Sequence, residues 1–226
     1  MTQNNWLSGS RRFFCSWSGG KDSCLSLYRE LKHGHECVSL FTMTDEDGEL
    51  SRSHGLTPEA LRVQAESLGV PLSKAGASWD LYEEEFKKQI SRFRDEQVHH
   101  GVFGDIDLEP HRDWVTRVCG EAGITPHLPL WKENRVALVR EFIDAGFRAV
   151  IVVVNCSMMP SEFLGREIDP DLIGELERIG VDPCGENGEY HTFVYDGPLF
   201  RKKINLIRGE SFSKEKYCFL PLRVSF

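Results

Sequence analysis

Apolar stretches of strand length alternate along the chain with segments in which apolar residues recur at helical spacing. Residues 13–16 form a short apolar run that ends at a glycine turn, and residues 37–43 and 102–106 have the same character. After the first run, leucine and tyrosine recur every three or four residues up to Gly34, which predicts a helix. Strands and helices that alternate in this way favour a parallel β-sheet covered by helices.

The sequence marks the beginning and end of one helix clearly. Thr57 is a candidate N-cap, Pro58 suits the first helical position, and Glu59 places an acid in the first turn. We therefore expect a helix over 57–68 that stops at Gly69. Amphipathic or apolar patterns predict further helices at residues 80–97, 114–120 and 136–145.

The longest apolar run, residues 149–154, predicts a buried strand of the same parallel sheet, because a strand covered on both faces reads as continuously apolar. The last forty residues differ, with β-rich segments and little helical pattern. We therefore predict an α/β, doubly wound parallel sheet in residues 1–180. A small β-rich extension in residues 181–226 is expected to pack on it.

Composition narrows the class of protein. The 226 residues carry a formal net charge of −8, which argues against nucleic acid as a partner. No stretch reaches the roughly 20 apolar residues of a membrane span, and the first residues contain no apolar signal-peptide core. Seven scattered cysteines without a C-x-x-C pair favour free thiols over a disulfide framework or a zinc site. We expect a cytoplasmic protein with no membrane contact.

Residues 16–23, Ser-Trp-Ser-Gly-Gly-Lys-Asp-Ser, lie between the first strand and the first helix and have the chemistry of an anion site. Two adjacent glycines let the backbone approach an anion without a clash from Cβ. The N–H groups of the turn and the helix dipole add positive potential. The spacing is neither that of a Walker A loop nor G-x-G-x-x-G. The residues expected to bind phosphate are Ser16, Ser18, Gly19, Gly20, Lys21, Asp22 and Ser23.

The segment Ser-Gly-Gly-Lys-Asp-Ser after a strand resembles the PP-loop of the ATP pyrophosphatases. The resemblance implies that ATP binds here with Mg²⁺, and that a carboxylate or carbonyl attacks the α-phosphate while pyrophosphate leaves. It also implies catalytic roles for Lys21 and Asp22. A glycine turn that only joins strand to helix is the plainer interpretation, but six matching residues in this context argue against it.

Two later segments extend the resemblance to the diphthine–ammonia ligase family. They are residues 101–119 with the Leu-Pro-Leu-Trp that follows, and residues 184–200 with Cys-Gly-Glu-Asn-Gly-Glu-Tyr and Asp-Gly-Pro-Leu-Phe. Membership would imply a ligase that forms AMP and pyrophosphate, adenylates a carboxylate and amidates it with ammonia or another amine. The acceptor would be a modified protein side chain, the diphthine of an elongation factor, or a small carboxylate.

The same match carries the residues of the 184–190 loop over as a substrate-site loop. Two carboxylates in a glycine-rich turn can bind ammonium, accept a proton from an attacking amine, or hold Mg²⁺. An ordinary surface loop with exposed acids is the alternative. Glu186 and Glu189 are the expected catalytic residues, and Gly185, Gly188 and Tyr190 the expected substrate-binding residues.

Polar residues after the 102–106 run add candidates. Asp105 and Asp107 could face ATP, with Asp105 joining Asp22 as a metal ligand, or could simply form a turn. Asp105 and Arg112 are expected to bind substrate. His111 and Arg112 could contact phosphate or the acyl group, with simple polarity at a helix start as the alternative.

Residues 155–157 follow the apolar run and are candidates for the same cleft. Asn155 and Ser157 could line it, whereas Cys156 is expected to be a core cysteine rather than a nucleophile.

Several alternatives stay open at the level of sequence. The chain has Asn187 and His191 where the family usually has Gly and Glu, which leaves the acceptor undecided. A tRNA-modifying PP-loop enzyme, a non-catalytic ATP- or AMP-binding regulatory protein and an ADP-forming ATPase are the rival functions. The oligomeric state is equally open, with a homodimer as one option.

Overall fold

A computed structural model describes residues 10–51 and 54–226. Its first part is a five-stranded, wholly parallel sheet in the order β3-β2-β1-β4-β5. The strands are β1 (Arg12–Ser16), β2 (Glu36–Thr44), β3 (Leu72–Gly76), β4 (His100–Val102) and β5 (Thr125–His127). The strand order reverses between β1 and β4, which is where open α/β sheets bind ligands.

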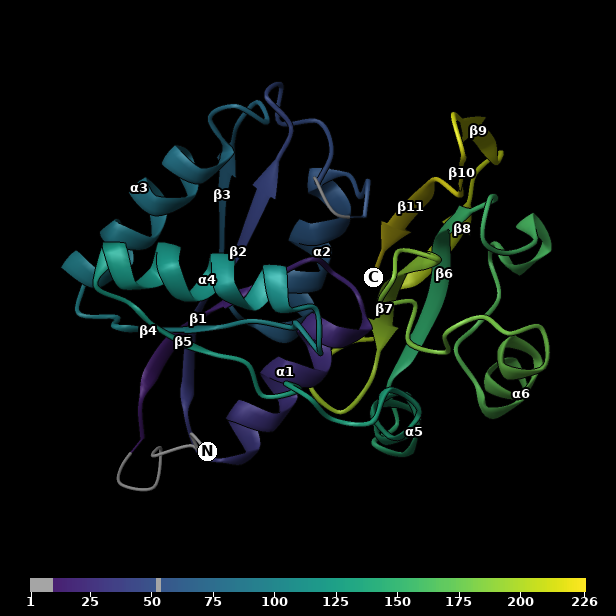
Figure 1. Cartoon of the computed structure of the whole chain (residues 1–226), viewed down its shortest axis with the longest axis horizontal. Helices are drawn as coiled ribbons and strands as arrows, with labels where there is room; N and C mark the ends of the chain where they lie inside the picture. The colour runs from purple at the N-terminus through teal and green to yellow at the C-terminus, as the bar shows by residue number, and fades with distance from the viewer. Residues whose placement is uncertain (1–9, 52–53) are drawn as a thin grey trace.

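Helices cover both faces of this sheet, as Figure 1 shows. Successive side chains of β1 separate into two cores: Phe13 and Cys15 pack with α1 (Lys21–Lys32) and α2 (Pro58–Leu68), and Phe14 packs on the opposite face with α3 (Tyr82–Asp95) and α4 (Glu109–Ala122). This alternation confirms the predicted doubly wound α/β fold.

The 149–154 run lies in a second sheet, so the prediction that it joins the parallel sheet was wrong. This sheet is antiparallel, in the order β7-β6-β10-β9. Its strands are β6 (Arg148–Asn155), β7 (Tyr190–Asp196), β9 (Phe212–Lys214) and β10 (Tyr217–Phe219). Residues of β6 share one core with α1 and α2, so these helices are packed between the two sheets. A continuous apolar run reports burial on both faces but not the sheet to which the strand belongs.

The C-terminal region is β-rich, as predicted. β11 (Leu222–Ser225) pairs with β8 (Asn205–Arg208) in a small separate sheet. Strands of the second sheet come from both predicted parts of the chain, and the division into 1–180 and 181–226 stays a prediction. The remaining elements are α5 (Arg135–Asp144), the 3₁₀ turn η1 (Ser161–Phe163) and α6 (Pro170–Arg178).

The predicted helix ends at α2 are confirmed. The Thr57 hydroxyl accepts a hydrogen bond from the Ala60 N–H at 3.3 Å, and Gly69 ends the helix with φ +68°. In contrast, β4 stops at Val102, whereas the predicted strand ran to residue 106. The four residues beyond Val102 instead form a loop that reaches the candidate site.

The cysteine prediction needs one correction. Cys156 and Cys218 form a disulfide that joins the end of β6 to β10, with the two Cα atoms 6.6 Å apart. Cys15, Cys24, Cys37, Cys119 and Cys184 are free thiols, as expected. Residues 62 positions apart can pair only through the tertiary fold, which cysteine spacing does not reveal.

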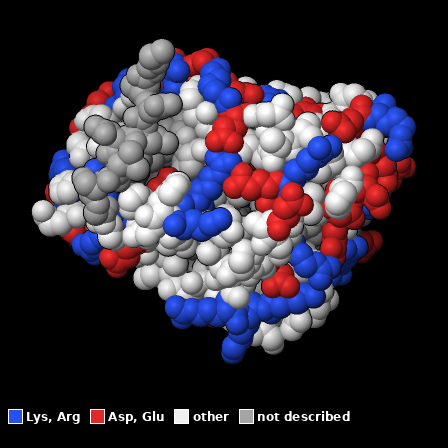
Figure 2. Space-filling model, turned by 90° about the horizontal axis from the view of Figure 1, so that it is seen from below, with Lys and Arg blue, Asp and Glu red and all other residues white. Residues whose placement is uncertain are grey.

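The surface carries both signs of charge. Figure 2 shows Lys and Arg interspersed with Asp and Glu over one face, which fits the expectation of no broad nucleic-acid footprint there. Over the described residues, no helix is both long and apolar enough to cross a membrane.

Candidate active site

The predicted phosphate loop leaves the carboxyl end of β1 and enters α1, at the point where the sheet reverses direction. The Ser18 and Ser23 hydroxyls lie 3.1 Å apart, and Ser18 Oγ also accepts from the Gly20 N–H at 3.3 Å. Among the described residues, the backbone N–H groups of Asp22 and Ser23 have no acceptor. The start of α1 therefore offers free donors to an anion.

Residues far away in sequence hold this loop in place. Gln64 of α2 is fully buried, and its amide donates to the carbonyls of Gly19 and Val194 at 2.9 and 2.6 Å. It accepts from the Trp17 indole N–H at 3.0 Å. On β7, the Thr192 hydroxyl accepts from the Lys21 N–H at 3.0 Å. None of these partners was predicted, because nothing local in the sequence distinguishes a loop-holding glutamine from an ordinary helical one.

Both loop glycines are required by their surroundings. Gly19 has φ +82°, and a Cβ there would lie 2.6 Å from the side chain of Leu56. A Cβ on Gly20 would lie 2.2 Å from the His54 ring. The two glycines thus allow close packing beneath the loop, in addition to the anion contact expected of them.

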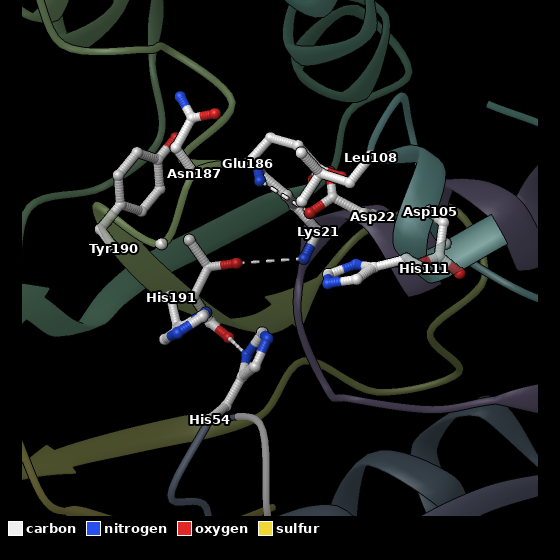
Figure 3. Close-up of a pocket in the computed structure, with 14 residues that line it drawn as sticks. Lys21, Asp22, His54, Asp105, Leu108, His111, Glu186, Asn187, Tyr190 and His191 are labelled. Carbon is white, nitrogen blue, oxygen red and sulfur yellow. Dashed lines mark hydrogen bonds and ion pairs between the residues drawn. The ribbon is translucent and has the colours of Figure 1, made fainter. Parts of the chain in front are cut away.

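A cavity of about 550 Å³ lies between the loop and the two segments predicted to bind substrate. Figure 3 shows side chains from α1, the loop after β4 and the loop before β7 around it. It brings together predicted residues from three distant parts of the sequence: Lys21, Asp22, Asp105, Gly185, Glu186, Gly188 and Tyr190. Leu108, His111, Asn187, His54, His191, Thr192 and Gly104 complete the lining.

Lys21 is buried and held by opposite charge. Its Nζ lies 2.8 Å from Asp22 Oδ2 and 5.4 Å from the centre of the Tyr190 ring. Burial alone lowers the pKa of Lys21, but Asp22, Tyr190 and Cys184 outweigh this and raise it above the ordinary value. Burial raises the pKa of Asp22 despite the charge of Lys21. The ammonium is therefore a permanent charge beside the phosphate loop.

Glu186 is the carboxylate whose acidity suits proton transfer. Its Oε1 accepts from the Ile106 N–H at 3.4 Å, and its own N–H donates to Asp182 Oδ2 at 3.0 Å. Burial and the negative charge of Asp22 raise the pKa of Glu186 to about 7. A carboxyl group with this pKa can exchange a proton at neutral pH.

Glu189 does not line the cavity. Its two carboxylate oxygens accept from the Asn187 backbone N–H at 3.0 Å and the Asn187 side-chain amide at 2.9 Å, and the residue is 4% exposed. Its predicted catalytic role stays a prediction, and the geometry suits the shaping of the loop. Tyr190 is similarly fixed, with its hydroxyl donating to the Pro183 carbonyl.

Asp105 and His111 form a pair at the cavity wall. His111 Nδ1 lies 3.4 Å from Asp105 Oδ1, and this contact raises the pKa of His111. Arg112 does not line either cavity, since it contacts Glu109, Asp113 and the Trp131 ring. Its predicted substrate role stays a prediction. Asp107 also points elsewhere and pairs with Arg135.

Two histidines that were not predicted as site residues face the same cavity. The rings of His54 and His191 lie 4.6 Å apart, and His54 Nδ1 lies 2.8 Å from the Thr192 carbonyl oxygen. Burial lowers the pKa of both rings, that of His191 to about 4. A neutral His54 must donate its Nδ1 proton to this carbonyl, which leaves Nε2 as an acceptor.

A second cavity of about 200 Å³ adjoins the first at the carboxyl ends of β1 and β2. Asp22, His54, Gly104 and Asp105 line both cavities. Ser16, Ser18 and Ser23 line the second, together with the apolar or aromatic side chains of Phe41, Met43, Tyr82 and Phe86. The candidates Asn155 and Ser157 line neither cavity; they hydrogen-bond to each other.

The described residues contain no cluster of three or more His, Cys, Asp or Glu side chains that could hold a metal ion. Two carboxylates, Asp22 and Asp105, line both cavities. This donor set fits Mg²⁺, which usually takes one or two protein carboxylates and completes its shell with phosphate oxygens and water.

Comparison with known proteins gives a consistent result over nearly the whole chain. Residues 12–126 match the family model described as the diphthamide synthase N-terminal domain, and residues 134–224 match the diphthamide synthase C-terminal domain. The chain is 31% identical to a diphthine–ammonia ligase of Danio rerio, covering 91% of this chain and 90% of that protein. It is 29% identical to the enzyme of the same name from Rattus norvegicus, covering 91% and 86%.

One solved structure was also compared. It is described as a predicted subunit of tRNA methyltransferase from Methanocaldococcus jannaschii. It superposes with a TM-score of 0.45 and 16% identity, over 81% of this chain and 96% of that one.

Proposed function

Because this chain belongs to the diphthamide synthase family, we propose that it is an ATP-dependent ligase that adenylates a carboxylate and amidates it, as a diphthine–ammonia ligase does. The observation that carries the proposal is the shared wall of the two cavities. The phosphate loop lies at one side, and Glu186, with a pKa of about 7, lies at the other.

ATP occupies the smaller cavity and the phosphate loop. The aromatic and apolar side chains of Phe41, Tyr82 and Phe86 suit an adenine ring, and the free N–H groups at the start of α1 suit the triphosphate. Lys21 adds a fixed positive charge next to the loop. Asp22 and Asp105 would hold Mg²⁺, which would neutralise phosphate charge when bound.

The acceptor enters the larger cavity. Its carboxylate oxygen forms a bond to the α-phosphorus of ATP, and the bond to the pyrophosphate oxygen breaks. Loop N–H groups and Lys21 stabilise the negative charge that develops on pyrophosphate. Because Asp22 and Asp105 line both cavities, the two substrates meet there.

Ammonia then attacks the acyl carbon of the adenylate, a C–N bond forms, and the C–O bond to AMP breaks. The attacking nitrogen must lose a proton in this step. The Glu186 carboxylate is the group we assign to accept it, since its pKa lies near neutral pH.

The acceptor is either a diphthine side chain of a protein or a smaller carboxylate. The relatives' name favours the first. Asn187 and His191, which depart from the family pattern, both line the cavity that would receive the acceptor.

Labelled nucleotides test the proposal directly. The protein is incubated with α-³²P-ATP, Mg²⁺ and ammonium, with either a diphthine-bearing elongation factor or a panel of small carboxylates. We expect label in AMP that depends on the acceptor and is lost in Lys21→Ala. Label in ADP would instead indicate a plain ATPase.

The regulatory alternative predicts a different pattern. Tight ATP binding by the wild-type protein with no AMP for any acceptor would favour a nucleotide sensor and overturn the ligase proposal. An exchange such as Lys32→Ala, at the far end of α1, serves as the control for Lys21→Ala, since Lys32 contacts only the Tyr28 ring in the described structure.

A further inference from the structure

Glu186 is held by two segments that have no contact in sequence. Its carboxylate accepts from Ile106, in the loop after β4, and its backbone N–H donates to Asp182, at the start of its own loop. The position of this carboxylate in the cavity therefore depends on the relative placement of the two segments.

One side chain bonds to both segments. The Arg135 guanidinium donates from Nε and Nη2 to the two oxygens of Asp107 at 2.8 and 2.6 Å. Its Nη1 donates to Asp182 Oδ2 at 2.5 Å, the same oxygen that accepts the Glu186 N–H. Arg135 thus lies between Asp107, one residue after Ile106, and Asp182, four residues before Glu186.

The main chain around Arg135 reinforces this connection. Its carbonyl accepts from the Cys184 thiol at 3.1 Å, and the Cys184 N–H donates to Asp182 Oδ1 at 3.0 Å. The side chains are shielded as well, with exposed fractions of 24% for Arg135, 27% for Asp107 and 10% for Asp182. Partly buried charges in a network of this kind are costly to leave unpaired.

We infer that Arg135 is a positioning residue for Glu186, which fixes the two loops that hold the proposed base over the reaction cavity. The inference rests on the proposed function, because it assigns Glu186 its role there. Arg135 lines neither cavity and does not touch substrate in this scheme. The planar fork of arginine is needed, since a single ammonium cannot make two parallel bonds to Asp107 and a third to Asp182.

Arg135→Lys is the variant that tests the inference, because it keeps the charge and removes the fork. We expect kcat to fall about 10- to 100-fold through misplacement of the base. The KM for ATP should stay within about twofold, because the phosphate loop is held by Gln64 and β7 instead. The matched control is Arg148→Lys, which loosens an ion pair with Glu167 at 2.8 Å outside both cavities and should keep wild-type kcat.

The pH dependence separates positioning from a general structural effect. Burial and the charges of Asp22, Lys21 and Asp105 set the acidity of Glu186. A loosened loop admits water, so the midpoint of the kcat profile near pH 7 should move to lower pH in Arg135→Lys but not in Arg148→Lys. A folded Arg135→Lys enzyme with wild-type kcat and an unchanged midpoint overturns the inference.

Two further measurements cover the remaining outcomes. If Arg135→Lys does not fold, Asp107→Asn breaks only one arm of the network, and a smaller change in the same direction is expected; no change contradicts us. If the wild-type protein forms no AMP, the proposed function fails by itself. A ¹³C titration of the Glu186 carboxyl group, assigned with Glu186→Gln, then still tests whether Arg135 holds it, and an unmoved titration overturns the inference.

Discussion

At the residue scale, burial rather than residue type decides what the acids of this protein can do. Glu186 and Glu189 lie three positions apart in one loop, yet only Glu186 faces the cavity. Asn187 occupies both oxygens of Glu189. The sequence motif therefore identified the loop, and the fold selects one of its two carboxylates.

The first prediction concerns Glu186 as a base. The ionised form increases as pH rises through about 7, so kcat measured at constant free ammonia should rise with pH and level off above 7. Glu186→Gln should lower kcat about 100-fold or more and abolish this limb. Glu177→Gln, an exposed exchange on α6, should leave the profile intact. A limb near pH 7 that persists in Glu186→Gln would mean that another group titrates there.

The second prediction concerns Glu30, which is buried in α1 and has a side-chain oxygen, Oε2, without a hydrogen-bond partner among the described residues. Burial raises the pKa of Glu30 to about 7 from an ordinary 4.5. The folded state therefore binds the proton more tightly than the unfolded state, and this contribution to stability is lost as pH rises from about 4.5 through 7.

Glu30→Gln should consequently raise the free energy of unfolding by about 2 kcal/mol at pH 8 relative to its effect at pH 4.5. Urea unfolding at the two pH values measures the difference. An equal effect at both would show that Glu30 ionises normally in the folded protein.

At the scale of elements, α2 and β7 hold the phosphate loop together. Gln64 of α2 bonds to both Gly19 of the loop and Val194 of β7, and the Val194 N–H donates to the Gly19 carbonyl at 3.0 Å. The loop thus has the sheet of the C-terminal region behind it as well as the strand that leads into it.

The third prediction is that Gln64→Leu weakens both stability and nucleotide binding. The change leaves the Trp17 indole N–H and two buried carbonyls without this partner, which should cost about 3 kcal/mol of unfolding free energy. ATP affinity, measured calorimetrically, should fall several-fold because the loop is no longer fixed. Gln89→Leu on the partly exposed face of α3 is the control. Unchanged ATP affinity in a folded Gln64→Leu protein would show that the loop does not depend on α2.

At the scale of the whole molecule, two sheets share one layer of helices, and the reaction cavity lies where the segments that belong to each sheet meet. The phosphate loop comes from the parallel sheet, and the Glu186 loop leads into β7 of the antiparallel sheet. The site is complete only when both sheets are packed on α1 and α2.

The fourth prediction concerns the Cys156–Cys218 bond that ties β10 to β6. A cross-link over 62 residues should stabilise the oxidised protein by about 4 kcal/mol through the entropy of the unfolded chain. A reductant should therefore lower the Tm of the wild-type protein and leave that of the Cys156→Ser, Cys218→Ser double variant unchanged. A Tm that does not respond to reductant would show that both thiols are free in solution.

The sequence by itself determined the α/β class, the position of most elements, the α2 caps and the phosphate loop. These features follow from local rules: hydrophobic period, capping chemistry and glycine geometry act within a few residues. The motif at 184–190 likewise identified its loop as part of the site.

Only the tertiary structure decided which sheet β6 joins, that Cys156 pairs with Cys218, and that Glu186 rather than Glu189 faces the cavity. Gln64, His54, Thr192 and Arg135 entered the site in the same way. Each of these outcomes depends on contacts between residues far apart in the chain. A pattern that repeats every two or four residues says which side chains are buried, but it says nothing about which distant segment buries them.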